Sequence, residues 1–142
     1  MPHTFLLKPA ASDVTGTYTS TEKTLLVTGK STIVHHEKIW AVDSFIQLEN
    51  GVVLQTDYKV EPLKISCLSV AFTAASSVLG ELAGNFTIQD DKIIEVYNTK
   101  NQQFTGQEIM TMLDENHYIS KGCLYQQGIV ESTWLLNLTK TL

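Results

Sequence analysis

Clusters of turn-forming residues divide the chain into short runs rich in Val, Ile, Thr, Tyr and Phe. The clearest clusters are ENG at 49–51, QDDK at 89–92, NTKNQ at 98–102, DENH at 114–117 and QQG at 126–128. β-branched and aromatic side chains suit a half-buried pleated surface, and all three prolines precede residue 63. Turns spaced by about 8–12 residues are typical of an antiparallel meander. The pattern therefore predicts an all-β chain.

The last turn, QQG, predicts a hairpin whose two faces can be assigned from the alternation of side chains. A three-residue loop with Gly128 in the left-handed conformation pairs Tyr125 with Ile129. Successive side chains of a strand point to opposite faces. The face predicted to point inward contains Tyr118, Ser120, Gly122, Leu124, Val130, Ser132, Trp134, Leu136 and Leu138.

The turn before it, DENH, extends this inner face by one strand. A four-residue loop pairs Leu113 with Tyr118 and predicts that Ile109 and Thr111 also point inward. The alternate side chains, which would point outward, are Glu108, Met110 and Met112.

The QDDK turn leaves two registers open. A three-residue loop brings Phe86, Ile88, Ile94 and Val96 onto one face, and a two-residue Asp-Asp turn exchanges the partners. The preceding segment, 68–84, predicts a strand to about residue 73, a loop or short helical turn near 72–80, and a strand from about residue 79. The runs GTYTS, KTLLVTG, STIVHHEKIW, VDSFIQL and VVLQTDYKV are predicted strands of the first half.

About 8–10 antiparallel strands in sequence must close on themselves or leave long edges exposed. Closure predicts a single up-and-down β-barrel domain over residues 1–142, with 1–12 as a peripheral N-terminal segment. A barrel of about eight strands has an interior that side chains fill or that holds one small ligand.

Composition and charge narrow the function classes. The chain has 142 residues, a net charge of −5 and no arginine. Arginine is the usual bidentate partner of phosphates and carboxylates, so nucleic-acid binding and arginine-clamped anionic ligands are not expected. No leader or membrane-spanning run is present, which predicts a cytoplasmic protein without membrane contact. Cys67 and Cys123 have no ligand-like spacing and are expected to be unpaired thiols.

At Gly16–Thr17–Tyr18 the chain has GTY where lipocalins carry a Gly-x-Trp on their first strand. With the predicted meander, the chain resembles the lipocalin and fatty-acid-binding group of calycin-type barrels from about Val14 to Leu138. The resemblance implies a lipocalin-like fold and an apolar cavity. Tyr18 replaces the usual tryptophan, and the arginine that stacks on that tryptophan in lipocalins is absent.

Small and hydroxylated residues among aromatics on the predicted inner face indicate a pocket with a few orienting hydrogen bonds. A packed core with the same alternation is the alternative. The candidate ligand-binding residues are Trp40, His35, Thr111, Tyr118, Ser120, Gly122, Ser132 and Trp134.

The adjacent pair His35 and His36 cannot enter one pocket, because neighbours on a strand point to opposite faces. One set combines Ile33, His35, Glu37 and Ile39, and the other Val34, His36, Lys38 and Trp40. The sequence leaves the choice between these two sets open.

Three functions of different classes follow. The first is binding of a small, mostly apolar, uncharged ligand. The second is a barrel enzyme of isomerase or cyclase type, with acid–base candidates His36, Asp57, Tyr58 and Tyr118. The third is a protein-interaction domain with a filled core and an outer patch of Met110, Met112 and Ile119. Binding is favoured over catalysis. No metal site, cofactor or catalytic residue is predicted from the spacings, and a homo-oligomer is compatible with the sequence.

Overall fold

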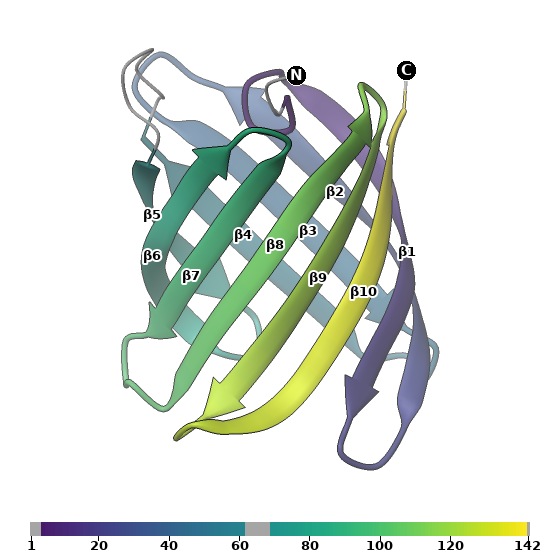
Figure 1. Ribbon diagram of the computed structural model, residues 1–142. Coiled ribbons are helices and arrows are strands. Elements are labelled where there is room, and N and C mark those ends of the chain that lie inside the picture. Colours follow the sequence, from purple (N-terminus) through teal and green to yellow (C-terminus); the bar gives the residue numbers. More distant parts are fainter. Residues whose placement is uncertain (1–3, 62–68, 142) are drawn as a thin grey trace.

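The computed structural model, which describes residues 4–61 and 69–141, contains ten antiparallel strands and, within those ranges, no helix. Figure 1 shows the strands tilted around a common axis. The strands are β1 (Ala10–Ser20), β2 (Thr24–His35), β3 (Trp40–Leu48), β4 (Val53–Val60), β5 (Ser69–Ser76), β6 (Gly80–Gln89), β7 (Lys92–Thr99), β8 (Phe104–Asp114), β9 (His117–Gln126) and β10 (Ile129–Thr141).

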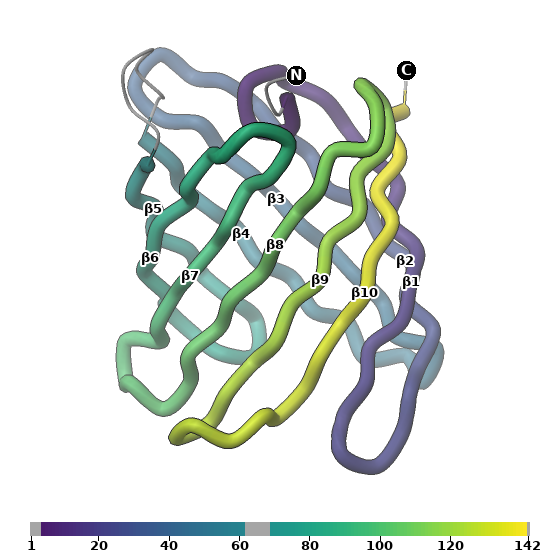
Figure 2. Tube along the Cα trace, viewed as in Figure 1, coloured from purple at the N-terminus to yellow at the C-terminus, as the bar shows by residue number. Residues whose placement is uncertain are grey.

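Each strand pairs with its neighbour in sequence, and β1 also pairs with β10, so the sheet closes into a barrel. The path of the chain around the barrel can be followed in Figure 2. Closure leaves no unpaired edge. The prediction of a single antiparallel up-and-down barrel is confirmed. The segment 72–80 forms the end of β5 and a turn into β6, without a helical turn.

The first half has fewer, longer strands than the separate runs suggested. The run KTLLVTG, from Thr24 on, and the first half of STIVHHEKIW form one strand, β2, which ends at His35. The chain then turns, and the His36 amide donates a hydrogen bond to the Ile39 carbonyl at 2.9 Å. Trp40 therefore begins β3 rather than ending the same strand. His3 and Cys67 lie outside the described residues.

The β9–β10 hairpin keeps its predicted faces although its register differs. Its loop has two residues, Gln127 and Gly128, both with positive φ, the conformation that a tight hairpin turn requires. One extra residue, Glu131, then forms a bulge between Val130 and Ser132. Together these changes shift the ladder by two residues, which preserves the face. Only Val130, which is 46% exposed, lies outside, contrary to prediction.

The β8–β9 hairpin inverts the predicted faces of β8. Asp114 pairs with His117 around a two-residue turn, and a bulge at Leu113 brings Met112 opposite Tyr118. A shift of one residue moves every side chain to the other face. The inward residues of β8 are thus Phe104, Gly106, Glu108, Met110 and Met112.

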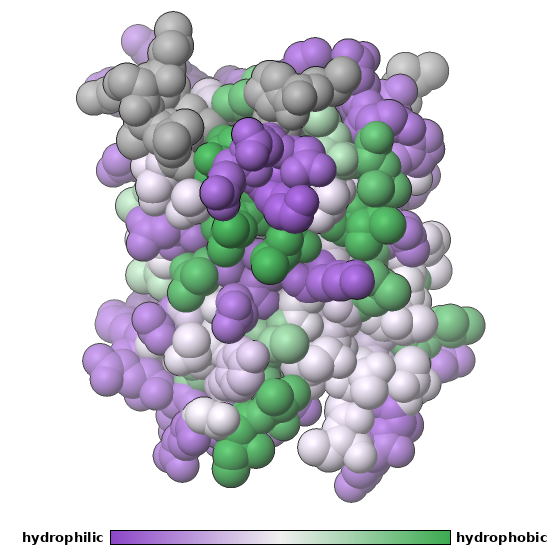
Figure 3. Space-filling model, in the orientation of Figure 1, coloured by the Kyte–Doolittle hydropathy of each residue, from purple (hydrophilic) through white to green (hydrophobic). Residues whose placement is uncertain are grey.

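The inward orientation predicted for Thr111 is therefore wrong, because the bulge turns it to the outer face with Ile109 and Leu113. The predicted outer patch of Met110, Met112 and Ile119 is also wrong, since both methionines point inward. Figure 3 shows polar and apolar side chains interspersed on the outer surface that it presents.

The β6–β7 turn adopts the second of the two registers that the sequence left open. Gln89 pairs with Lys92 around Asp90 and Asp91, and Asp90 has a φ of 53°. Ile88 then pairs with Ile93, and Phe86 with Glu95. Phe86 remains inside as predicted. The inward positions of β7 belong to Ile93, Glu95 and Tyr97 instead of Ile94 and Val96.

One end of the barrel is plugged by residues that precede β1. Phe5 and Leu6 are 7% and 1% exposed, so these two residues belong to the core and are not peripheral as predicted. The Tyr118 hydroxyl is hydrogen-bonded to Thr4 Oγ1 at 2.7 Å, and the Phe5 ring meets the Tyr118 ring edge-on. The N-terminal segment crosses this end in Figure 1.

Candidate functional site

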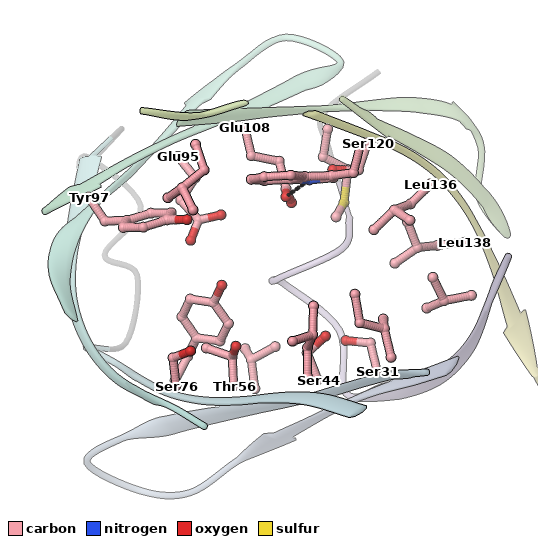
Figure 4. A pocket seen from close by; sticks show the side chains of 18 of the residues that line it. Ser31, Ser44, Thr56, Ser76, Glu95, Tyr97, Glu108, Ser120, Leu136 and Leu138 are labelled. Atoms are coloured by element: carbon pink, nitrogen blue, oxygen red, sulfur yellow. Dashed lines mark hydrogen bonds between the residues drawn. The ribbon is translucent and has the colours of Figure 1, made fainter. Parts of the chain in front are cut away.

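A cavity of about 220 Å³ lies inside the barrel between two facing walls. Its lining extends from Phe5 and Leu6 at the plugged end to Val78 and Leu79 in the β5–β6 turn. Most of the lining is apolar and comes from Val14, Val42, Ile46, Leu54, Phe86, Ile93, Met110, Leu124, Leu136 and Leu138. Polar side chains enter it from both walls (Figure 4).

One wall carries four hydroxyl groups, which we call the hydroxyl row: Ser31 on β2, Ser44 on β3, Thr56 on β4 and Ser76 on β5. Each is the direct cross-strand partner of the next. Ser76 Oγ accepts hydrogen bonds from the amides of the following turn. The row gives this wall several small, uncharged groups that can both donate and accept hydrogen bonds.

The opposite wall carries two carboxyl groups, which we call the carboxyl pair (Figure 4). Glu95 on β7 and Glu108 on β8 are direct cross-strand partners. Side chains opposite one another in a sheet lie close together, and like charges there repel. The Trp134 indole N–H donates a hydrogen bond to Glu108 Oε2 at 2.6 Å.

Two glycines make room for the aromatic rings of this wall. A Cβ at Gly122 would collide with the Trp134 indole, and a Cβ at Gly106 would collide with the Tyr97 phenol. Gly122 pairs with Trp134 across β9 and β10 and with Glu108 across β8 and β9. The absent side chain therefore lets the indole lie against the sheet beside the carboxylate that it binds.

Burial and mutual repulsion raise the pKa of both carboxyls. The Glu95 pKa lies well above its ordinary value, because burial and then the charge of Glu108 disfavour ionisation, with Tyr58 opposing them. Burial also raises the pKa of Glu108, but Ser120 and Trp134 stabilise its ionised form. Of two adjacent carboxyls in such a site, one has its pKa strongly raised. Glu95 is the member that retains its proton more readily, and Glu108 is the member that ionises more readily.

Three buried polar atoms of the cavity wall have no hydrogen-bond partner among the described residues: Glu95 Oε1, Ser120 Oγ and Ser132 Oγ. Ser120 lies near enough to the Glu108 carboxylate to lower its pKa, but not in hydrogen-bond geometry. Buried polar groups are normally paired, since leaving one unpaired costs about 1–3 kcal/mol. The wall is thus prepared to hydrogen-bond with a molecule in the cavity.

Among the described residues, no lysine or histidine lines the cavity, so neither acid has a counter-ion there. The remaining titratable groups of the lining are the phenols of Tyr18, Tyr58 and Tyr97. Burial raises the pKa of Tyr58 and that of Tyr97, which keeps these phenols neutral. The electrostatic potential in the cavity is therefore negative.

The structure distributes the predicted site residues among four places. Ser120, Ser132 and Trp134 line the cavity, and Gly122 lies beneath the indole. Thr111 is on the outer face, as described above.

Tyr118, His35 and Trp40 belong to the plugged end instead. His35 Nε2 is hydrogen-bonded to the Leu6 carbonyl oxygen at 2.8 Å, and its ring stacks on Trp40 with centroids 3.9 Å apart. His36 is exposed. His35 is thus the inner histidine of the pair, and its hydrogen bond to Leu6 holds the residues before β1 against β2.

The acid–base candidates chosen from the sequence mostly lie elsewhere. Asp57 is exposed on the outer face of β4, and of these candidates only Tyr58 lines the cavity. The two residues missed were Glu108, which was predicted to point outward, and Glu95, whose face depended on the register left open at the QDDK turn. A sequence signal existed for Glu95: the two-residue Asp90–Asp91 turn turns it inward.

The described residues contain no group of three or more His, Cys, Asp or Glu side chains that could hold a metal ion. They also contain no helix long and apolar enough to cross a membrane. Cys123 is unpaired and half-buried.

The closed meander and its internal cavity give this chain the architecture of a lipocalin-like up-and-down barrel. Neither a protein-family model nor a curated protein sequence matches the chain. Among solved structures, the S-type phycobiliprotein lyase CPES from Guillardia theta superimposes with a TM-score of 0.70 over 94% of this chain and 88% of that one. The two sequences are 10% identical, so the likeness concerns the fold.

Proposed function

We propose that this protein binds a small, mostly apolar molecule inside the barrel. The observation that carries the proposal is the cavity of about 220 Å³, whose apolar lining includes three unpartnered buried polar atoms. Ligand sites commonly combine a mostly apolar lining with a few placed polar groups. A cavity of this size greatly exceeds the roughly 10–15 Å³ that one water requires.

The negative electrostatic potential of the cavity limits the charge that a ligand can carry. A fatty-acid carboxylate would meet Glu95 and Glu108 without a lysine or histidine in the lining. Burying a further negative charge there is costly. The ligand is therefore a molecule without a negative charge, in keeping with the uncharged ligand expected from the sequence.

The structural neighbour adds a candidate for testing. Its name describes a phycobiliprotein lyase, which makes a bilin pigment a second probe beside retinol. A bilin carries propionate groups, so the bilin and palmitate both serve as anionic comparisons, and retinol serves as the uncharged probe.

The test combines thermal shift with tryptophan fluorescence, because the two tryptophans report on different places. Trp134 lines the cavity, whereas Trp40 stacks on His35 at the plugged end. A binding probe should raise the melting temperature and quench the tryptophan emission of Trp40→Phe, in which Trp134 is the only tryptophan. The matched variant Trp134→Phe should show much weaker quenching.

No stabilisation by retinol or any other uncharged apolar probe would contradict the proposal. Stronger stabilisation by palmitate or the bilin than by retinol would contradict the restriction on charge.

A further inference from the structure

The carboxyl pair is the most unusual feature of the cavity wall. Glu95 is 5% exposed, and one of its oxygens has no partner among the described residues. Glu108 lines the cavity and has the indole N–H as a hydrogen-bond donor. Acidic side chains are rarely buried unless they are paired with a cation. Because the lining offers no cation, the complement is expected to come from the ligand.

Aromatic rings surround the carboxyl pair. Phe86 is the cross-strand partner of Glu95 on one side, and the Trp134 indole lies beside Glu108 on the other. The Tyr58 ring meets the Phe86 ring with centroids 5.9 Å apart. Rings of this kind attract a cation through their negative faces, and aromatic cages bind ammonium groups in this way.

We propose that the carboxyl pair binds the protonated nitrogen of an apolar amine whose body occupies the apolar part of the cavity. This inference rests on the proposed function and specifies its ligand class. Glu108 and Glu95 Oε1 accept N–H donation from the ammonium, and the aromatic rings surround it. The hydroxyl row on the facing wall remains available to a second polar group of the ligand (Figure 4).

The proton balance of this binding step is defined. At neutral pH the free amine is already an ammonium, and the carboxyl pair holds one proton. When the ammonium enters, Glu95 releases its proton to solvent, and the cavity then holds two carboxylates and one cation. The charge of the occupied site equals that of the free pair. The phenols of Tyr18, Tyr58 and Tyr97 face the same cavity, and the two with raised pKa values retain their protons.

Three probes of nearly equal shape test the inference: 2-phenylethylamine, 2-phenylethanol and 3-phenylpropionate. Isothermal titration calorimetry at neutral pH, in buffers of different ionisation enthalpy, measures both affinity and proton release. The amine should bind at least about tenfold more tightly than the alcohol, because charge-assisted hydrogen bonds are the stronger ones. It should release about one proton, whereas the alcohol should release none and the acid should not bind.

Glu95→Gln and Glu108→Gln should each remove most of the preference for the amine, and Glu95→Gln should remove the proton release. Continued binding of the alcohol shows that the variants are folded. The matched control is Glu81→Gln, since Glu81 is 68% exposed and pairs with Lys100 on the outer surface. It should leave all three affinities unchanged.

The outcomes separate the two proposals. If the alcohol binds but the amine has no advantage and releases no proton, the amine site is refuted and ligand binding stands. An amine preference that survives in Glu95→Gln/Glu108→Gln also refutes the site. If neither these probes nor retinol bind, the proposed function itself fails.

Discussion

The two walls of the cavity solve the same problem, a polar group inside an apolar barrel, in different ways. The hydroxyl row places small neutral groups at adjoining positions of β2 to β5, and it needs less support than the carboxyl pair because a hydroxyl costs less to bury than a charge. The carboxyl pair places two acids side by side on β7 and β8. It depends on the Trp134 N–H and on the space above Gly122.

This difference indicates which wall of the barrel is more sensitive to substitution. On the hydroxyl wall each side chain acts nearly independently of its neighbours. On the carboxyl wall, protonation, indole position and backbone approach are linked, since Gly122 adjoins both Trp134 and Glu108. Substitutions in the carboxyl wall should therefore have large, coupled effects, and substitutions in the hydroxyl row small, separate ones.

The largest effect is expected at Gly122. Gly122→Val places a side chain where the Trp134 indole lies, which displaces the ring and breaks its hydrogen bond to Glu108. Overpacking a filled site costs about 1–3 kcal/mol and sometimes more, so we expect a loss of about 3 kcal/mol in the free energy of unfolding by urea denaturation. In a Trp134→Leu background the same change should cost much less. Equal costs in the two backgrounds would show that the indole is not the obstacle.

A pH-dependent effect of intermediate size is expected at Glu95. Its pKa in the folded state is raised above the ordinary 4.5, so its contribution to stability is fully present below pH 4.5 and is lost as the pH rises through the folded pKa. Glu95→Gln removes this loss. As the pH rises, the free energy of unfolding of the variant should increase relative to that of the wild type. The increase should reach up to about 1.4 kcal/mol for each unit by which the folded and unfolded pKa values differ.

Urea denaturation at several values between about pH 4.5 and about pH 8 measures this difference. Glu81→Gln, on the outer surface, should give a nearly constant difference from the wild type. A constant difference for Glu95→Gln as well would mean that its pKa is not raised in the folded protein.

The comparison also shows what the sequence could and could not predict. The alternation of side chains and the spacing of turns were sufficient for the closed antiparallel barrel, and for the inward positions of Ser120, Ser132 and Trp134. These positions survived an error in the β9–β10 loop because the turn and the Glu131 bulge together shift the register by an even number of residues.

On the carboxyl wall, Glu108 was missed because the register of the β8–β9 hairpin differs from the predicted one by one residue, which is an odd number. A single bulged residue, Leu113, exchanges the faces of β8 and brings Glu108 inside. Leu113 is 60% exposed and Ile109 40% exposed, so the more apolar set of β8 contributes its side chains to the outer surface. Hydrophobicity alone thus favoured the wrong face. A bulge is a property of the paired strands, and the period-two pattern of one strand does not contain it.

The smallest effects are expected from one isosteric change made on both faces of the barrel. Thr56→Val removes a hydroxyl of the hydroxyl row, and Thr111→Val removes one from the outer face of β8. Both retain a β-branched side chain that suits a strand, so the free energy of unfolding should change by less than about 1 kcal/mol in each. Calorimetric titration should then distinguish them, because Thr56→Val alone should alter the affinity for a hydroxylated probe such as 2-phenylethanol. An equal loss of affinity in Thr111→Val would place the binding site outside the barrel, and with it the distinction between the two walls would lose its functional meaning.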